Sequence, residues 1–187
     1  VYLGIFQPEK FWVLDEHRIR GAATLPGTGY IELVTAAFED FSGSKTCEIR
    51  ELLFLTPLAV EDGKQVSINI DMKKDGDAYQ FKIASRLTEE WREHARGTIA
   101  LLKETQLPAR DIQSLTARCQ DALVENARVK GQTDGGQTFL EVGPRWNNLN
   151  SIRFGETEGL AEIQIPETYD ADLTSYPLHP ALMDTAT

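Results

Sequence analysis

A continuous apolar stripe at helical spacing runs from residue 30 to residue 41, and it constrains the fold more than any other feature of the sequence. Its members recur every three or four positions: Tyr30, Leu33, Val34, Ala37, Phe38 and Phe41. Such a wide apolar face predicts a helix embedded in the core rather than one lying on the surface. Thr28 is the expected N-cap of this helix, and Gly43 lies just past its end.

The hydrophobic period changes to two directly after this helix. Residues 66–72 and 79–83 each alternate apolar and polar side chains, and Asp75-Gly76 between them predicts a hairpin. Further strands are expected at residues 49–60 and 91–102. One buried helix followed by antiparallel strands indicates an α+β fold with the sheet wrapped over the helix.

Composition divides the chain into two unequal units. Residues 1–103 contain the helix and its strands, and the more polar, glycine-containing residues 104–136 are interpreted as an interdomain linker. Residues 137–187 contain an expected strand at 160–165 and the start of a helix near residue 180, which is about a third of a domain. We therefore expect a duplicated helix-in-sheet unit, part of a longer polypeptide, whose second copy is incomplete.

The charge balance limits the expected partners. The 187 residues include 19 basic and 29 acidic side chains, a formal net charge of −10, which argues against nucleic acid and gives no reason to expect binding to an anionic membrane. No apolar run approaches the ~20 residues that span a bilayer. Cys47 and Cys119 make no disulfide framework, and no Cys/His spacing resembles a metal site. We expect reduced thiols, a cytoplasmic location and no bound metal.

Two side chains stand out as candidates for acid–base chemistry. His17 precedes a glycine-bounded turn into the N-terminus of the buried helix, where outward N–H groups and the helix dipole favour a developing oxyanion. Asp184 lies among apolar residues at the start of the second expected helix, a setting that favours a protonated carboxyl group, as a general acid requires. The simpler alternatives are a structural histidine and a first-turn aspartate that interacts with the helix dipole.

Four short motifs occur in order along the chain. They are His17-x3-Gly21-x4-Pro26, Trp91-x2-His94-Ala95-x-Gly97, Val142-Gly143-Pro144-x-Trp146 and His179-Pro180-Ala181-Leu182-x-Asp184. They resemble the HxxxGxxxxP, WxxHAxG, YGPxF and HPALxD signatures of dehydratase domains in modular polyketide synthases, and the related dehydratase of animal fatty acid synthase is similar. Each motif alone is weak, but four in the same order across nearly the whole chain are specific.

The resemblance implies a double hotdog, in which two antiparallel sheets each wrap around a central helix, with the second hotdog incomplete in this chain. It implies that His17 is the general base, that Asp184 is the general acid, and that Pro26, Gly27 and Val142-Gly143-Pro144 contact the substrate. The N–H of Gly27 would be the principal donor to the enolate oxygen. The implied reaction removes water from a (3R)-hydroxyacyl chain on the phosphopantetheine arm of an acyl carrier protein, and the domain binds no cofactor of its own.

Two positions depart from the family pattern. Val142 stands where the family has the tyrosine of YGPxF, and the Gln or His expected four residues beyond Asp184 falls outside the sequence. Three readings therefore stay open: an active dehydratase, a dehydratase-like cyclase (pyran-forming) or double-bond isomerase, and a catalytically silent structural domain. A thioesterase-type single hotdog fits less well because such domains lack this pair of motifs.

The remaining expectations concern partners and the other histidines. The implied partners are an acyl carrier protein and neighbouring synthase domains, and the resemblance is compatible with a homodimer. His94 is expected to be packed or hydrogen-bonded, and His179, which Pro180 follows, to shape the turn before the helix of Asp184.

Overall fold

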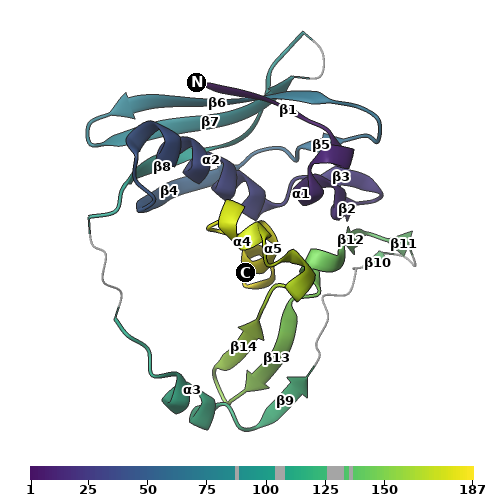
Figure 1. Cartoon of the computed structure of the whole chain (residues 1–187), viewed down its shortest axis with the longest axis vertical. Coiled ribbons are helices and arrows are strands. Elements are labelled where there is room, and N and C mark those ends of the chain that lie inside the picture. Colours follow the sequence, from purple (N-terminus) through teal and green to yellow (C-terminus); the bar gives the residue numbers. More distant parts are fainter. Residues whose placement is uncertain (87–88, 104–107, 126–132, 135–136) are drawn as a thin grey trace.

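A long central helix and a five-stranded antiparallel sheet form the core of the N-terminal unit. The computed structural model describes residues 1–86, 89–103, 108–125, 133–134 and 137–187. Helix α2 (Gly27–Ser42) lies against one face of the sheet (Figure 1). The strands follow the order β1-β6-β7-β8-β4, with bounds β1 (Tyr2–Phe6), β6 (Val66–Asp75), β7 (Ala78–Arg86), β8 (Arg92–Leu101) and β4 (Cys47–Phe54). This arrangement confirms the predicted α+β fold.

The apolar stripe of α2 is buried against this sheet, as its spacing predicts. Tyr30, Val34 and Phe38 are at most 3% exposed and belong to one core cluster with apolar side chains of β6, β7 and β8. Burial of each such side chain stabilises the fold by about 2 kcal/mol. The last member of the stripe, Phe41, is 55% exposed, and its ring packs edge-on against Tyr79 at a centroid distance of 5.1 Å.

The start of α2 differs from the expectation. Its N-cap is Pro26, which has no capping side chain, so the prediction of Thr28 as the N-cap is wrong. Thr28 lies within the first turn, and its hydroxyl donates instead to the carbonyl oxygen of Pro180, 2.9 Å away. A partner 152 residues away in the sequence replaces the local one. Gly43 ends the helix in the left-handed conformation, with φ of 71°, as predicted.

The strands follow the period-two segments, with one interruption. β6 and β7 pair in an uninterrupted register down to Asp75 and Ala78, and Gly76 takes a φ of 60° in the two-residue turn between them. The expected strand at residues 49–60 is split, because β4 ends at Phe54 and β5 (Ala59–Val60) belongs to another sheet. Pro57 lies in the break and has no N–H to donate to a ladder.

A second sheet connects the two units. Its strand order is β12-β2-β3-β5, formed by β12 (Leu140–Val142), β2 (His17–Ile19), β3 (Ala22–Thr24) and β5. Arg20 and Gly21 join β2 to β3 with φ values of 51° and 80°, and glycine adopts such a conformation without strain. Because β12 comes from the C-terminal unit, both units contribute backbone to the neighbourhood of His17.

The C-terminal unit has a sheet of its own, away from the five-stranded sheet (Figure 1). Its order is β14-β13-β9, with bounds β9 (Ala122–Glu125), β13 (Leu149–Phe154) and β14 (Gly159–Ile163). β9 lies within residues 104–136, the stretch interpreted as a linker, and so does α3 (Ile112–Arg118), whose N-cap is Asp111. Part of that stretch therefore pairs with strands of the C-terminal unit. A two-residue ladder joins β10 (Thr133–Asp134) to β11 (Gln137–Thr138).

The remaining helices of the described residues are short. Their bounds are η1 (Pro8–Lys10), α1 (Trp12–Asp15), η2 (Pro144–Trp146), η3 (Glu167–Tyr169), α4 (Asp172–Ser175) and α5 (Pro180–Thr185). α5 lies beside the N-terminal half of α2 (Figure 1), joined to it by the Thr28–Pro180 hydrogen bond. In the described part of the chain, no helix combines the length and apolar character needed to cross a bilayer.

Candidate active site

His17 is positioned by the hairpin that leads into α2. It is the first residue of β2 and is 7% exposed. Its Nδ1 lies 2.8 Å from the carbonyl oxygen of Thr24 on β3. A carbonyl oxygen only accepts hydrogen bonds, so Nδ1 carries the proton. In the neutral ring, Nε2 then keeps its lone pair, which is the state that a general base requires.

A pocket of about 350 Å³ brings His17 together with the start of α2. Pro26, Gly27 and Tyr30 line the pocket with it. Gly27 is the first residue of a 16-residue helix, so its N–H has no acceptor within the helix and lies at the positive end of the dipole. A β-carbon at Gly27 would lie 3.3 Å from the ring of Phe54, which also lines the pocket. Glycine therefore keeps this space open.

The structure places Val142, Gly143 and Pro144 beside His17. Val142 is the residue directly opposite His17 in the β12–β2 pair. The N–H of Gly143 donates to the carbonyl oxygen of Glu16 at 2.7 Å, and a β-carbon at Gly143 would overlap the Glu16 side chain. This close approach of strand and side chain requires a glycine. Pro144 then begins η2, a single turn that ends at Trp146.

Trp146 connects the two candidate catalytic residues. Its side chain is 1% exposed, and its ring centroid lies 5.8 Å from that of His17, with the planes tilted by 34°. Its Nε1–H donates to Oδ2 of Asp184 at 2.8 Å. One indole therefore contacts the imidazole and the carboxyl group, which come from different units. No role was predicted for Trp146 from the sequence, although an N–H donor in place of the phenylalanine of YGPxF was a usable signal.

Asp184 is half-buried on α5, and two further contacts fix this helix. The Nδ2 of the fully buried Asn148 donates to the carbonyl oxygens of Arg145 and Ala181, each at 3.0 Å, and so joins η2 to α5. The Thr28 hydroxyl joins the start of α2 to the start of α5. Asp184 is thus held in position relative to both η2 and α2.

A cluster of charged side chains surrounds the other side of η2. Arg145 pairs with Glu16 from the N-terminal unit and with Asp172 on α4, whose Oδ2 lies 2.6 Å from Arg145 Nε. All three side chains are less than a fifth exposed. The guanidinium also lies over the rings of Trp12 and Tyr169, 4.5 and 4.1 Å from their centroids. This cluster, hereafter the Arg145 cluster, joins the two units next to the pocket.

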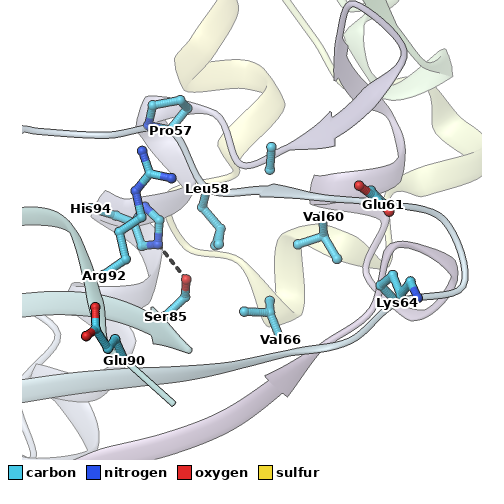
Figure 2. A pocket seen from close by; sticks show the side chains of 11 residues that line it. Pro57, Leu58, Val60, Glu61, Lys64, Val66, Ser85, Glu90, Arg92 and His94 are labelled. Atoms are coloured by element: carbon cyan, nitrogen blue, oxygen red, sulfur yellow. Dashed lines mark hydrogen bonds between the residues drawn. The ribbon is translucent and has the colours of Figure 1, made fainter. Parts of the chain in front are cut away.

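His94 is packed and hydrogen-bonded as expected, and His179 is the residue directly before α5, where a role in the turn was expected. Figure 2 shows a larger pocket of about 670 Å³ in which Ser85 and His94 face one another, 2.6 Å apart from Oγ to Nε2. The other nitrogen of His94 donates to the Thr56 carbonyl oxygen at 3.0 Å, and burial lowers the pKa of His94. Burial also lowers the pKa of His179, whose ring stacks on Trp12 at 5.0 Å. His17 is not among the residues that line the larger pocket.

The cysteines and acidic side chains form no separate centre in the described ranges. Cys47 and Cys119 are both free thiols, and burial raises the pKa of Cys47. Within these ranges, no three side chains of His, Cys, Asp or Glu are grouped as ligands of a metal ion would be. The groups with evident chemistry are therefore the imidazole of His17 with the helix N-terminus in its pocket, and the carboxyl group of Asp184, which Trp146 connects to His17 but which is not among the residues that line that pocket.

Comparison with known families identifies relatives of both units. The model of the polyketide synthase dehydratase domain matches residues 1–86, and that of the polyketide synthase dehydratase N-terminal domain matches residues 133–187. Together they cover about three quarters of the chain. The polyketide synthase PksN of Bacillus subtilis is 27% identical over 198 residues, an alignment that covers 99% of this chain. The chain spans only 3% of the length of PksN.

Solved structures share the fold. A trans-AT polyketide synthase dehydratase domain from Brevibacillus brevis matches with a TM-score of 0.80 at 22% identity, covering 99% of this chain and 70% of that one. The CurK dehydratase matches in two inactive mutant forms, one with a histidine changed to phenylalanine and one with an aspartate changed to asparagine, with TM-scores of 0.83 and 0.82 at 18% identity. These alignments cover 99% and 98% of this chain and 66% of the CurK chains. The likeness confirms the expected double-hotdog fold, of which this chain holds a part.

Proposed function

The chain belongs to the polyketide synthase dehydratase family, and we propose on this basis that it removes water from a 3-hydroxyacyl thioester carried on an acyl carrier protein. The observation that carries the proposal is the contact of His17 and Asp184 with one indole ring, that of Trp146. The proposal is that this imidazole and this carboxyl group, which come from different units, act on the same substrate. The inactive forms of CurK, altered at a histidine and at an aspartate, support this pair of groups.

In the proposed reaction, Nε2 of His17 takes the proton from carbon 2 of the acyl chain. The electron pair of that C–H bond first moves toward the thioester oxygen, which becomes an enolate oxygen. It then returns to form the double bond between carbons 2 and 3 as the bond from carbon 3 to the hydroxyl oxygen breaks. Asp184 donates its proton to the departing oxygen, which leaves as water. The resulting imidazolium and carboxylate return to their starting states when the proton passes from His17 to Asp184.

Each group meets a specific demand of this chemistry. A proton next to a thioester carbonyl is weakly acidic, so its removal needs a neutral imidazole and a donor aimed at the enolate oxygen. The Nδ1–H bond to Thr24 keeps the His17 ring in the tautomer with Nε2 unprotonated, and the Gly27 N–H is the proposed donor to the enolate. Loss of one such donor typically costs a factor of about 10²–10³ in rate. Hydroxide is a poor leaving group, which is why a protonated Asp184 is required.

The proposed substrate-binding residues lie in the pocket of His17 or beside it, and Val142, Gly143 and Pro144 are not among its lining residues. Pro26 and Gly27 line it, and Val142, Gly143 and Pro144 pass beside His17 on β12 and at the start of η2. The acyl chain would arrive on the phosphopantetheine arm of a carrier protein, so the domain itself needs no cofactor. We place the protein in the cytoplasm with neighbouring synthase domains. The net charge of −10 gives no electrostatic attraction for an acidic carrier protein. Tethering of both domains within one polypeptide would instead bring them together through a high effective concentration.

Two substitutions test the proposal directly. In the natural full-length polypeptide, His17→Ala and Asp184→Asn should each abolish formation of the α,β-unsaturated product from a 3-hydroxyacyl carrier-protein substrate, measured by mass spectrometry of the carrier protein. Asp77→Asn, at an exposed carboxylate on the β6–β7 hairpin, is the matched control and should keep full turnover. Near-normal turnover by either site variant would contradict the role assigned to that residue.

A specific observation favours a second candidate function. Val142 presents an apolar side chain opposite His17, where the family resemblance expects a tyrosine hydroxyl. A pocket without this hydroxyl could instead direct the same base and acid toward double-bond migration or pyran ring closure. Chromatography of the released acyl products distinguishes the candidates: a cyclised or β,γ-unsaturated main product supports the second one, and a wild-type domain that leaves the substrate unchanged indicates a silent structural domain.

A further inference from the structure

Trp146 donates its N–H to a side-chain carboxyl group and also packs its ring against His17, an arrangement that packing alone does not require. It is one of the most deeply buried side chains of the described residues, so its indole N–H must find an acceptor or pay a desolvation cost. The acceptor it finds is not a backbone carbonyl group but Oδ2 of Asp184, at 2.8 Å. The ring that carries this N–H is in turn fixed by His17 at 5.8 Å and by Trp12 at 6.1 Å, in a tilted and an edge-on arrangement.

The hydrogen bond distinguishes the two oxygens of Asp184. An N–H group can only donate, so Oδ2 acts as the acceptor. In the protonated form that the proposed function requires, the carboxyl proton then resides on Oδ1. The oxygen that would donate this proton is therefore the one that is not directed at Trp146. When Oδ1 gives up this proton, negative charge spreads over both oxygens, and the bond from Trp146 becomes charge-assisted and stronger. An interaction that strengthens as the reaction proceeds lowers the barrier.

We propose that Trp146 is a positioning residue that orients the acid Asp184 and stabilises the carboxylate formed as its proton moves to the departing hydroxyl. The inference rests on the proposed function and adds a residue to it. In the step itself, the O–H bond of Asp184 breaks, a new O–H bond forms on the leaving oxygen, and the electron pair stays on the carboxylate. Trp146 exchanges no proton and acts only through Asp184.

The test separates this role from simple packing by changing the leaving group. Trp146→Phe keeps an aromatic ring against His17 and removes the N–H donor. On a 3-hydroxyacyl thioester, kcat should fall about tenfold to a hundredfold, the range for a hydrogen bond to a charged group, with KM nearly unchanged. On the matching 3-chloroacyl thioester, chloride leaves without a proton, so the same variant should eliminate at close to the wild-type rate. Asp184→Asn should show the same contrast, whereas His17→Ala should lose both reactions.

All variants are made in the natural full-length polypeptide, and Trp91→Phe, at a 42% exposed tryptophan of the N-terminal unit, serves as the matched control. Equal losses on both substrates, or no loss on the hydroxy substrate, would overturn the role of Trp146 while leaving the dehydratase proposal in place. A wild-type protein inactive on the hydroxy substrate overturns both. If Trp146→Phe does not fold, benzothienylalanine at position 146 keeps the shape of the ring without the N–H and must give the same contrast.

Discussion

Replacing Arg145 with methionine tests how the two units are held together around the pocket. The guanidinium binds the carboxylates of Glu16 and Asp172 and lies over the rings of Trp12 and Tyr169. Methionine keeps most of the apolar stem but leaves the two carboxylates without a counter-charge. The change therefore removes the electrostatic contacts of the Arg145 cluster and retains most of its packing.

The magnitude follows from the burial of the cluster. Breaking a buried ion pair by removal of one partner costs about 3–5 kcal/mol, and an exposed pair contributes about 0–1 kcal/mol. The side chains of Arg145, Glu16 and Asp172 are 14%, 13% and 19% exposed, so water still reaches part of each one. We therefore expect a loss of about 3 kcal/mol in the free energy of unfolding. At about 2–4 °C per kcal/mol for a domain of this size, Tm should fall by about 6–12 °C.

Thermal unfolding of the dehydratase domain, followed by circular dichroism, measures the loss. The further changes Glu16→Gln and Asp172→Asn should restore a large part of the Tm, because they remove the two charges that Arg145→Met leaves unpaired. Arg118→Met is the matched control, since Arg118 pairs with Glu158 at the surface with side chains 52% and 36% exposed, and its loss should cost less than about 1 kcal/mol. A Tm of Arg145→Met equal to that of Arg118→Met would refute the reasoning.

Two further predictions follow from buried polar groups. Tyr30→Phe removes the oxygen that accepts the buried Leu58 N–H at 3.0 Å, so urea titrations should show a free energy of unfolding lower by about 1–3 kcal/mol. Because burial raises the pKa of Tyr30 to about 12, ultraviolet titration of the folded variant should also lack the last tyrosine to ionise. Burial lowers the pKa of His94 and His179, so below their unfolded value of about 6.5 the unfolded chain binds more protons than the folded one. The contribution of both groups to the free energy of unfolding is therefore complete above that pH and declines as the pH falls. His94→Gln should reduce the slope of the free energy of unfolding against pH between about 6.5 and 5. An unchanged slope in this variant would contradict a neutral His94 in the folded state.

Features that depend on local periodicity could be predicted from the sequence. The α2 stripe and the alternation along β6 and β7 each encode one element within a short window, and the Asp75-Gly76 signal marks the turn between the two strands. The α+β class follows from these elements alone. The break at Pro57 was visible in the sequence, but the sheet that β5 joins was not, because pairing with β3 depends on a segment more than 30 residues away.

Features that depend on distant partners were beyond the sequence. β9 is a strand because β13 offers it a ladder, and its polar surroundings resemble those of a linker. Thr28 has the residue type of an N-cap, but a carbonyl oxygen of α5 competes for its hydroxyl. The candidate residues His17 and Asp184 were recognisable by motif, whereas their common neighbour Trp146 was identified only when η2, β2 and α5 were placed together.

The shortness of the elements around the pocket has a functional consequence. α5 has six residues, α4 has four and η2 has three, and isolated helices shorter than about 12–15 residues are marginal in water. Their positions therefore depend on contacts to other elements, namely the Thr28 bond to α5, the Asn148 bonds between η2 and α5, and the Arg145 cluster. These contacts set where the Asp184 carboxyl group lies relative to His17, which is anchored in a sheet. Weakening them should lower the rate of the acid-dependent step before the N-terminal core unfolds, because the acid is the less firmly held partner.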